Sequence, residues 1–208
     1  MIEWSIEAFR ACDSVRSIVV AAPPGHVGDL GGHDLGVVEG GETRAQSVAN
    51  ALEAVGTEYV AVHDAARPLL TSELVEALVA DLDAAPEAAG VIAAAPVTDT
   101  IKRAGESSRQ KGPSGGQYRR LAIKRTEDRA ELWAAQTPQV FRTDALREAL
   151  ASAERPQEAT DEAMLVEWNG GTVLIHPVAE QNLKVTTPLD LRVVELLLAE
   201  RAESAAGA

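Results

Sequence analysis

The chain has 208 residues, 46% of them hydrophobic and 25% charged, so it is long enough to bury a sizeable core. Its net charge of -13 excludes nonspecific nucleic-acid binding, although local cations still allow an anionic small molecule to bind. No apolar run is long enough to span a membrane and no signal-peptide pattern is present, so we expect a cytoplasmic protein that contacts neither membrane nor nucleic acid. Cys12 is the only cysteine, which excludes a disulfide framework and a cysteine metal site.

Helical and extended patterns alternate along the chain, which is typical of a mostly parallel sheet covered on both faces. Amphipathic spacing predicts an opening helix over residues 1–11 and later helices around residues 45–52, 75–82 and 188–198. Apolar runs predict strands at residues 17–22, 37–38, 59–63, 90–95, 121–124 and 172–177. The sequence therefore predicts an α/β protein.

Local signals mark the starts of two of these helices. Thr43 and Gln46 have the spacing of a capping box, and Thr187-Pro188 supplies an N-cap followed by a first-turn proline. We expect a single domain over residues 1–208 that carries a β-arm over about residues 101–131. Residues 104–117 are rich in Gly and Ser and predict a flexible loop at the tip of the arm. The tail, residues 202–208, is small and polar and predicts a frayed end.

The segment His63-Asp64-Ala65-Ala66-Arg67-Pro68 follows an apolar strand and is the first candidate site. In an open α/β sheet the ligand crevice lies at the carboxyl ends of the strands, where Asp64 would hold a metal and Arg67 a phosphate. A surface ion pair or a simple turn explains the same residues, and the segment alone does not decide between them.

Four further segments carry candidate residues, each with a plainer alternative. Gly40, Gly41, Glu42 and Ser47 lie in a strand-to-helix turn that allows a backbone to approach a flat ligand, or simply caps a helix. The other candidates are Thr100 (followed by Lys102 and Arg103), Arg129, Thr137 and Lys184, all of which could bind phosphate. The plainer alternatives are a solvated strand end for Thr100, an exposed ion pair for Arg129, a turn for Thr137 and an exposed strand residue for Lys184. His26, His33, His63 and His176 lack metal-ligand spacing, so we expect them to be structural or exposed.

Taken in order, six segments resemble the 2-C-methyl-D-erythritol 4-phosphate cytidylyltransferase family of the non-mevalonate isoprenoid pathway. They are VEGGETRAQSV (38–48), VHDAARP (62–68), APVTDTIKR (95–103), TEDRAELWAAQTPQVF (126–141), ATDEAMLVE (159–167) and QNLKVTTPLDL (181–191). The resemblance implies a Rossmann-like nucleotidyltransferase fold, with three αβα layers and a projecting β-arm exchanged in a homodimer. It also implies the reaction, in which a phosphate oxygen of methylerythritol phosphate attacks the α-phosphorus of CTP and pyrophosphate leaves.

The resemblance implies roles for the candidate residues as well. Asp64 and Lys184 match catalytic residues, with Asp64 at the junction of substrate and metal, and the metal expected is Mg²⁺ or another divalent cation. Gly40, Gly41, Glu42 and Ser47 match the turn that recognises cytosine and ribose. Arg67 matches a substrate-binding neighbour of Asp64 in the active site. Thr100 and Thr137 match groups near the sugar phosphate, and Arg129 matches the arm arginine that binds this phosphate in the partner subunit.

The chain departs from the family pattern in two places. The family opens with a strand and a glycine-rich loop whose arginine and lysine hold the triphosphate, and no segment here matches them. We therefore expect unpaired strand edges and uncovered apolar surface in the sheet. The arm tip is also longer than in the family. Two alternatives stay open: a cytidylyltransferase acting on a pentitol phosphate such as ribitol 5-phosphate, and a noncatalytic relative that binds CTP.

Overall fold

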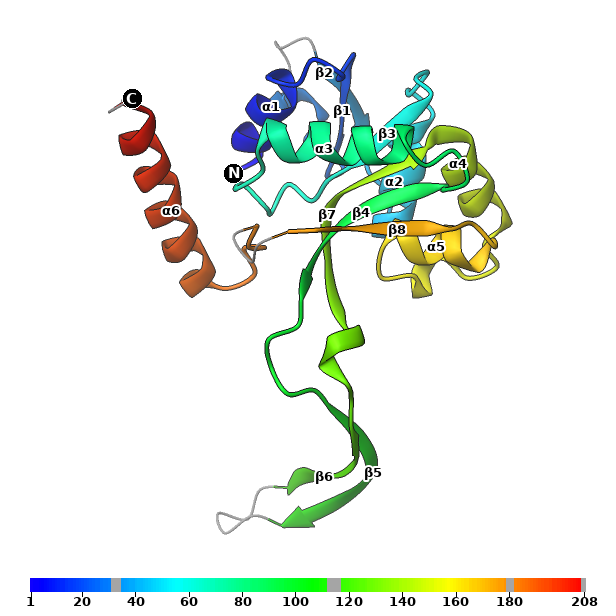
Figure 1. Ribbon diagram of the computed structural model, residues 1–208, viewed down its shortest axis with the longest axis vertical. Helices are drawn as coiled ribbons and strands as arrows, with labels where there is room; N and C mark the ends of the chain where they lie inside the picture. The colour runs from blue at the N-terminus through cyan, green and yellow to red at the C-terminus, as the bar shows by residue number, and fades with distance from the viewer. Residues whose placement is uncertain (31–34, 112–116, 179–181, 207–208) are drawn as a thin grey trace. The chain divides into compact units, whose positions relative to one another are not determined.

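The computed structural model describes residues 1–30, 35–111, 117–178 and 182–206 and divides the chain into two compact units (Figure 1). The first unit comprises residues 1–94 and 135–208, and the second comprises residues 95–134. Among the described residues, no helix is long and apolar enough to cross a membrane.

A four-stranded sheet forms the centre of the first unit, in the order β3-β7-β4-β8. β3 (Tyr59–Val62) runs antiparallel to β7 (Trp133–Arg142), whereas β4 (Gly90–Pro96) runs parallel to β8 (Val173–Pro177). Every residue of β4 except Pro96 is buried, as expected for a strand covered on both faces. The apolar runs therefore predicted β3, β4 and β8 to within one residue at each boundary. β7, which lies between β3 and β4, was not predicted as a strand.

Helices cover both faces of this sheet. One core cluster packs α2 (Arg44–Leu52), α4 (Thr143–Ser152) and α5 (Glu162–Trp168) against Ile92 and Phe141. A second cluster packs α3 (Ser72–Asp83) against Val91 and Val140, the sequence neighbours of those two residues. Because side chains alternate along a strand, the two clusters lie on opposite faces, which confirms the predicted layered α/β architecture.

The remaining strands of the first unit form a separate two-stranded parallel sheet, β1 (Ile18–Ala22) with β2 (Leu35–Glu39). No backbone ladder joins β1 to β3 in the part of the chain that the structure describes. A cavity of about 820 Å³ lies between them and is lined by both strands and by α1 (Ile2–Arg10), α2 and α3. The expectation of unpaired strand edges beside apolar surface is therefore confirmed.

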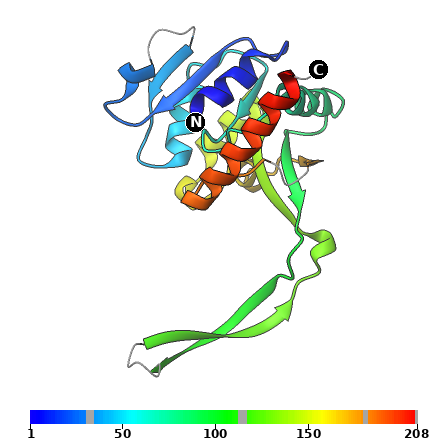
Figure 2. The same cartoon turned by 90° about the vertical axis from the view of Figure 1, so that its left-hand side faces the viewer.

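The second unit is an antiparallel ribbon of β5 (Lys102–Lys111) and β6 (Gln117–Thr126), followed by the short 3-10 helix η2 (Arg129–Glu131) (Figure 2). The predicted loop over residues 104–117 is wrong as far as Lys111, because cross-strand pairing continues through this polar segment, with register shifts near Ala104. Residues 112–116 of that predicted loop lie outside the described residues.

The last helix, α6 (Pro188–Ala206), starts at the predicted proline. It is longer than expected, because helical hydrogen bonding continues to Ala206 through the segment predicted to fray. Arg201 near its end donates from Nη1 to the carbonyl of Leu69, 2.8 Å away, which anchors the helix to the segment before α3. Residues 207 and 208 lie outside the described residues.

Candidate active site

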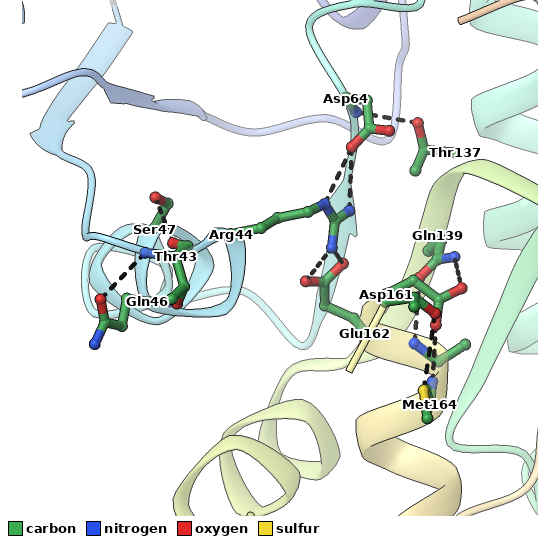
Figure 3. A network of polar contacts seen from close by, with 12 residues as sticks. Thr43, Arg44, Gln46, Ser47, Asp64, Thr137, Gln139, Asp161, Glu162 and Met164 are labelled. Carbon is green, nitrogen blue, oxygen red and sulfur yellow. Dashed lines mark hydrogen bonds and ion pairs between the residues drawn. The ribbon is translucent and has the colours of Figure 1, made fainter. Parts of the chain in front are cut away.

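The Asp64 carboxylate lies directly after β3, where the chain turns with a hydrogen bond from the Arg67 amide to the Asp64 carbonyl. Its Oδ1 accepts from both Nε and Nη2 of Arg44, each at 3.2 Å (Figure 3). Its Oδ2 accepts from Lys184 Nζ at 2.8 Å. Arg67 Nε lies 3.8 Å from Oδ2. Three cations from three separate segments therefore converge on one carboxylate that is only 14% exposed.

Burial alone would raise the pKa of Asp64, but the hydrogen bond from Lys184 and the charge of Arg44 lower it below its ordinary value. Asp64 is therefore ionised at neutral pH. With Glu162, the second carboxylate bound to Arg44, the cluster contains three cations and two anions. Its net charge is positive, and such a corner attracts anionic groups such as phosphates.

His63 and Thr137 support the Asp64 turn from inside the protein. The Asp64 amide donates to Thr137 Oγ1 at 3.0 Å, and Thr137 Oγ1 lies 3.1 Å from His63 Nδ1. His63 Nε2 lies 3.1 Å from the carbonyl of Arg67, which only a protonated Nε2 satisfies. Nδ1 of the neutral ring then accepts the Thr137 hydroxyl proton, and burial lowers the pKa of His63 to about 4.

This network determines what Thr137 does within the chain. The residue is buried, and its hydroxyl both accepts from Asp64 and donates to His63. Its contact with a sugar phosphate stays a prediction, while the structure gives it a role in holding the turn. His63 was expected to be structural or exposed, and it is structural.

Arg67 connects the Asp64 turn to the segment that carries Lys184. Its Nη1 donates to the carbonyl of Asn182 at 2.7 Å, and the Val185 amide donates to the carbonyl of Ala66 at 2.8 Å. Asn182 in turn donates from Nδ2 to the carbonyl of Thr137 at 2.5 Å. Lys184 is therefore held beside Asp64 by the backbone on both sides of it, and its side chain remains 44% exposed.

The predicted nucleotide turn is a tightly capped helix start. Ser47 Oγ accepts from the Gly41 amide at 3.1 Å, and Gln46 Oε1 accepts from the Glu42 amide at 2.9 Å. The predicted capping box is complete, because the Thr43 amide donates to Gln46 Oε1 and the Gln46 amide donates to Thr43 Oγ1, each at 3.2 Å. A Cβ on Gly41 would lie 2.3 Å from Gln46 Cβ, so only glycine fits there. A Cβ on Gly40 would lie 3.0 Å from Ser47 Oγ. The Glu42 side chain is exposed and free of the cap.

Thr100 and Arg129 belong to the second unit. Thr100 is exposed just before β5, and Arg129 Nη1 donates to the carbonyl of Thr98 at 2.7 Å. Lys102 Nζ donates to Thr126 Oγ1 at 2.8 Å. Arg103, which follows, forms an ion pair with Glu127. The structure therefore brings Asp64, Arg67, Thr137 and Lys184 together in the first unit, and Thr100 and Arg129 belong to the second unit.

Asp64 was the predicted metal ligand. The described residues contain no group of three His, Cys, Asp or Glu side chains able to hold a metal ion, and His33 lies outside them. Both oxygens of Asp64 already face cationic side chains. The corner therefore does not fit a divalent cation held by protein groups alone, since the cation would compete with Arg44 and Lys184 for the same oxygens.

The corner opens into the cavity between β1 and β3, whose lining includes Arg44, Asp64 and Lys184. Its volume of about 820 Å³ lies within the range of small-molecule sites. Arg44 and Glu162 are the site residues that the sequence analysis did not single out. Both lie inside segments that carried the family resemblance, but 118 residues separate them and no local pattern pairs them.

The comparisons with known proteins agree on one family. The family model of IspD, 2-C-methyl-D-erythritol 4-phosphate cytidylyltransferase, matches residues 1–200. The protein of that name from Burkholderia multivorans is 39% identical over 216 residues, which cover 98% of this chain and 86% of the relative. The one from Symbiobacterium thermophilum is 41% identical and covers 95% of this chain and 80% of the relative. Among solved structures, the Thermus thermophilus enzyme is 36% identical with a TM-score of 0.74, covering 94% of this chain and 87% of that one.

Proposed function

The chain belongs to the 2-C-methyl-D-erythritol 4-phosphate cytidylyltransferase family, and we propose that the Asp64 corner is where it carries out the family's reaction. The activity is transfer of CMP from CTP to 2-C-methyl-D-erythritol 4-phosphate, a step of isoprenoid precursor biosynthesis. A phosphate oxygen of the acceptor forms the new bond to the α-phosphorus of CTP, the bond to the β-phosphate oxygen breaks, and pyrophosphate leaves.

The observation that carries this proposal is the pairing of Asp64 with Lys184. Phosphoryl-type transfer depends on positioning and on neutralising negative charge, because the protein has little covalent chemistry to perform. Lys184 is a point charge with three N–H donors, of which Asp64 Oδ2 takes one. Its other donors are available to a phosphate oxygen, and Asp64 holds the ammonium in place.

Further roles follow from the same family assignment. The turn at Gly40, Gly41, Glu42 and Ser47 binds the cytosine and ribose of CTP, and Thr100 with Arg129 binds the acceptor phosphate. The described residues offer no group of three ligating side chains, so the triphosphate would supply most of the ligands of a Mg²⁺ ion, which would neutralise charge on the leaving pyrophosphate.

We also propose that the arm forms a homodimer. Leu121 and Ile123 lie two residues apart on β6, so they share one face of the ribbon, and they are 54% and 65% exposed. Apolar side chains on a two-stranded ribbon need a partner surface to be buried. Light scattering after gel filtration tests this: we expect a dimer for the natural chain and a monomer for Ile123→Lys, with Lys124→Met, at an exposed position on the same strand, as the control.

Incubation with CTP, Mg²⁺ and one of two acceptors tests the reaction. We expect pyrophosphate release with 2-C-methyl-D-erythritol 4-phosphate and much less with ribitol 5-phosphate at the same concentration. Faster turnover with ribitol 5-phosphate would show that a pentitol phosphate, and not methylerythritol phosphate, is the acceptor. CTP binding measured by calorimetry, without pyrophosphate release from either acceptor, would show a noncatalytic nucleotide-binding relative instead.

A further inference from the structure

Glu162 is a charged residue buried beside the candidate active site. It lies in the first turn of α5, and its side chain is 1% exposed. A buried carboxylate is unfavourable unless it is paired and hydrogen-bonded, and here the partner is Arg44. Arg44 Nη1 lies 2.5 Å from each Glu162 oxygen, so a single guanidinium nitrogen pairs with both oxygens of the carboxylate.

The same guanidinium reaches Asp64. Arg44 Nε and Nη2 each lie 3.2 Å from Asp64 Oδ1, on the opposite side from the Glu162 contact (Figure 3). Every nitrogen of Arg44 therefore faces a carboxylate, which distinguishes it from Lys184, whose contact in the cluster is Asp64 alone. This geometry suits a residue that orients another side chain rather than one that grips a substrate.

Glu162 is itself anchored through its helix. Gln139 on β7 accepts from the Ala163 amide at 3.2 Å and donates to Asp161 at 2.9 Å, which fixes the start of α5 to the sheet. Asp161 also caps the helix by accepting from the Met164 amide at 3.0 Å. The position of Glu162 is therefore set by β7.

Arg44 lies in the first turn of α2, directly after the glycine turn and its cap Thr43. A guanidinium fixed on Glu162 consequently ties that turn to Asp64. We propose that the Arg44–Glu162 pair positions the active site. It holds the Asp64 carboxylate toward Lys184, and it fixes the position of the glycine turn relative to Asp64. The role in turnover rests on the proposed function, whereas the hold on Asp64 does not.

Glu162→Gln tests the proposal by keeping the shape of the side chain and removing its charge. The control is Glu158→Gln, which removes the carboxylate of an exposed ion pair with Arg155. A misplaced catalytic group costs up to about a hundredfold in rate, so we expect kcat to fall ~10- to 100-fold in Glu162→Gln while KM for the acceptor changes little. Arg44→Lys, which keeps the charge, should retain more activity than Arg44→Gln, and a kcat equal to that of the control would overturn the role in turnover.

A second readout does not depend on turnover. Backbone amide chemical shifts of residues 64–67 in ¹⁵N-labelled protein report the Asp64 turn directly. We expect them to move in Glu162→Gln and in Arg44→Gln and to stay unchanged in Glu158→Gln. Unchanged shifts in folded Glu162→Gln and Arg44→Gln would overturn the proposal even if the natural chain is active. If the natural chain releases no pyrophosphate, the proposed function fails and the amide shifts alone decide the hold on Asp64.

Discussion

Lys184 Nζ lies 2.8 Å from Asp64 Oδ2, although 120 residues separate the two in the chain. The pair forms because Arg67 and the Ala66 carbonyl bind the backbone around Lys184, one at Asn182 and the other at Val185. The cation is therefore placed by the fold before any substrate arrives. Preorganised charges of this kind lower a reaction barrier without reorganisation during the reaction.

Replacing Lys184 tests this pair. We expect Lys184→Met to lower kcat for pyrophosphate release by about a hundredfold or more, because the methionine keeps the length of the side chain and removes the charge. Lys124→Met, at an exposed position on β6, is the matched control and should behave like the natural chain. If kcat of Lys184→Met lies within about threefold of kcat of the control, Lys184 has no role in the mechanism.

His63 predicts a pH dependence of stability. Burial lowers its pKa in the folded chain to about 4 from the ordinary 6.5, so between these values the unfolded chain binds more protons than the folded one. The stability that His63 contributes is therefore complete above about pH 6.5 and is lost as the pH falls toward 4. At 1.36 kcal/mol per unit, the loss amounts to roughly 3 kcal/mol.

Urea unfolding at several pH values measures this effect. The free energy of unfolding of the natural chain should fall more steeply between pH 6.5 and pH 4 than that of His63→Gln, which does not titrate. His26→Gln, at an exposed histidine, should follow the natural chain. Equal slopes for the natural chain and His63→Gln would contradict a neutral, partly buried ring.

Thr137 predicts a difference between two small substitutions. Thr137→Val keeps the shape but leaves the Asp64 amide and His63 Nδ1 without their partner, so we expect a loss of about 1–3 kcal/mol in unfolding free energy. Thr137→Ser keeps the hydroxyl and should lose less. Denaturant titration compares them, and equal losses would show that the hydroxyl does not support the turn.

Much of the fold was predictable because its signals are local. The apolar run of β4 and the capping box of Thr43 and Gln46 each act over a few residues, and both were found where expected. The arm strands were misjudged because Ser107 and Ser108 pair with β6 through backbone groups, which a polar, Gly- and Ser-rich sequence does not reveal. Propensity is a weak guide for an exposed ribbon, since its pairing does not depend on burying side chains.

The site was predictable only in part, for the same reason. Asp64 and Arg67 follow from the position of a strand end, which is a sequence feature. The contact between Arg44 and Glu162 depends on the packing of α5 against β7 through Gln139, which no spacing in the sequence encodes. Thr137 was predicted as a substrate contact from its segment, whereas its burial beside His63 is a tertiary property.

Arg129 predicts a selective effect on the acceptor. Within the described part of the chain its guanidinium donates one hydrogen bond, from Nη1 to the Thr98 carbonyl, and its other donors can reach a phosphate. Hydrogen bonds to charged groups contribute about 1.5–3 kcal/mol, so Arg129→Ala should raise KM for methylerythritol phosphate roughly 10- to 100-fold while KM for CTP changes little.

The matched control is Arg125→Ala, which removes an exposed arm arginine that pairs with Glu127. Initial rates at varied acceptor and fixed CTP, followed by the reverse, separate the two constants for each variant. An equal rise of both KM values in Arg129→Ala would assign the residue to the general integrity of the arm. If only KM for the acceptor rises in Arg129→Ala, and it does not rise in Arg125→Ala, Arg129 recognises the sugar phosphate. The planar guanidinium of this one arginine would then be needed to bind the acceptor and not to bind CTP.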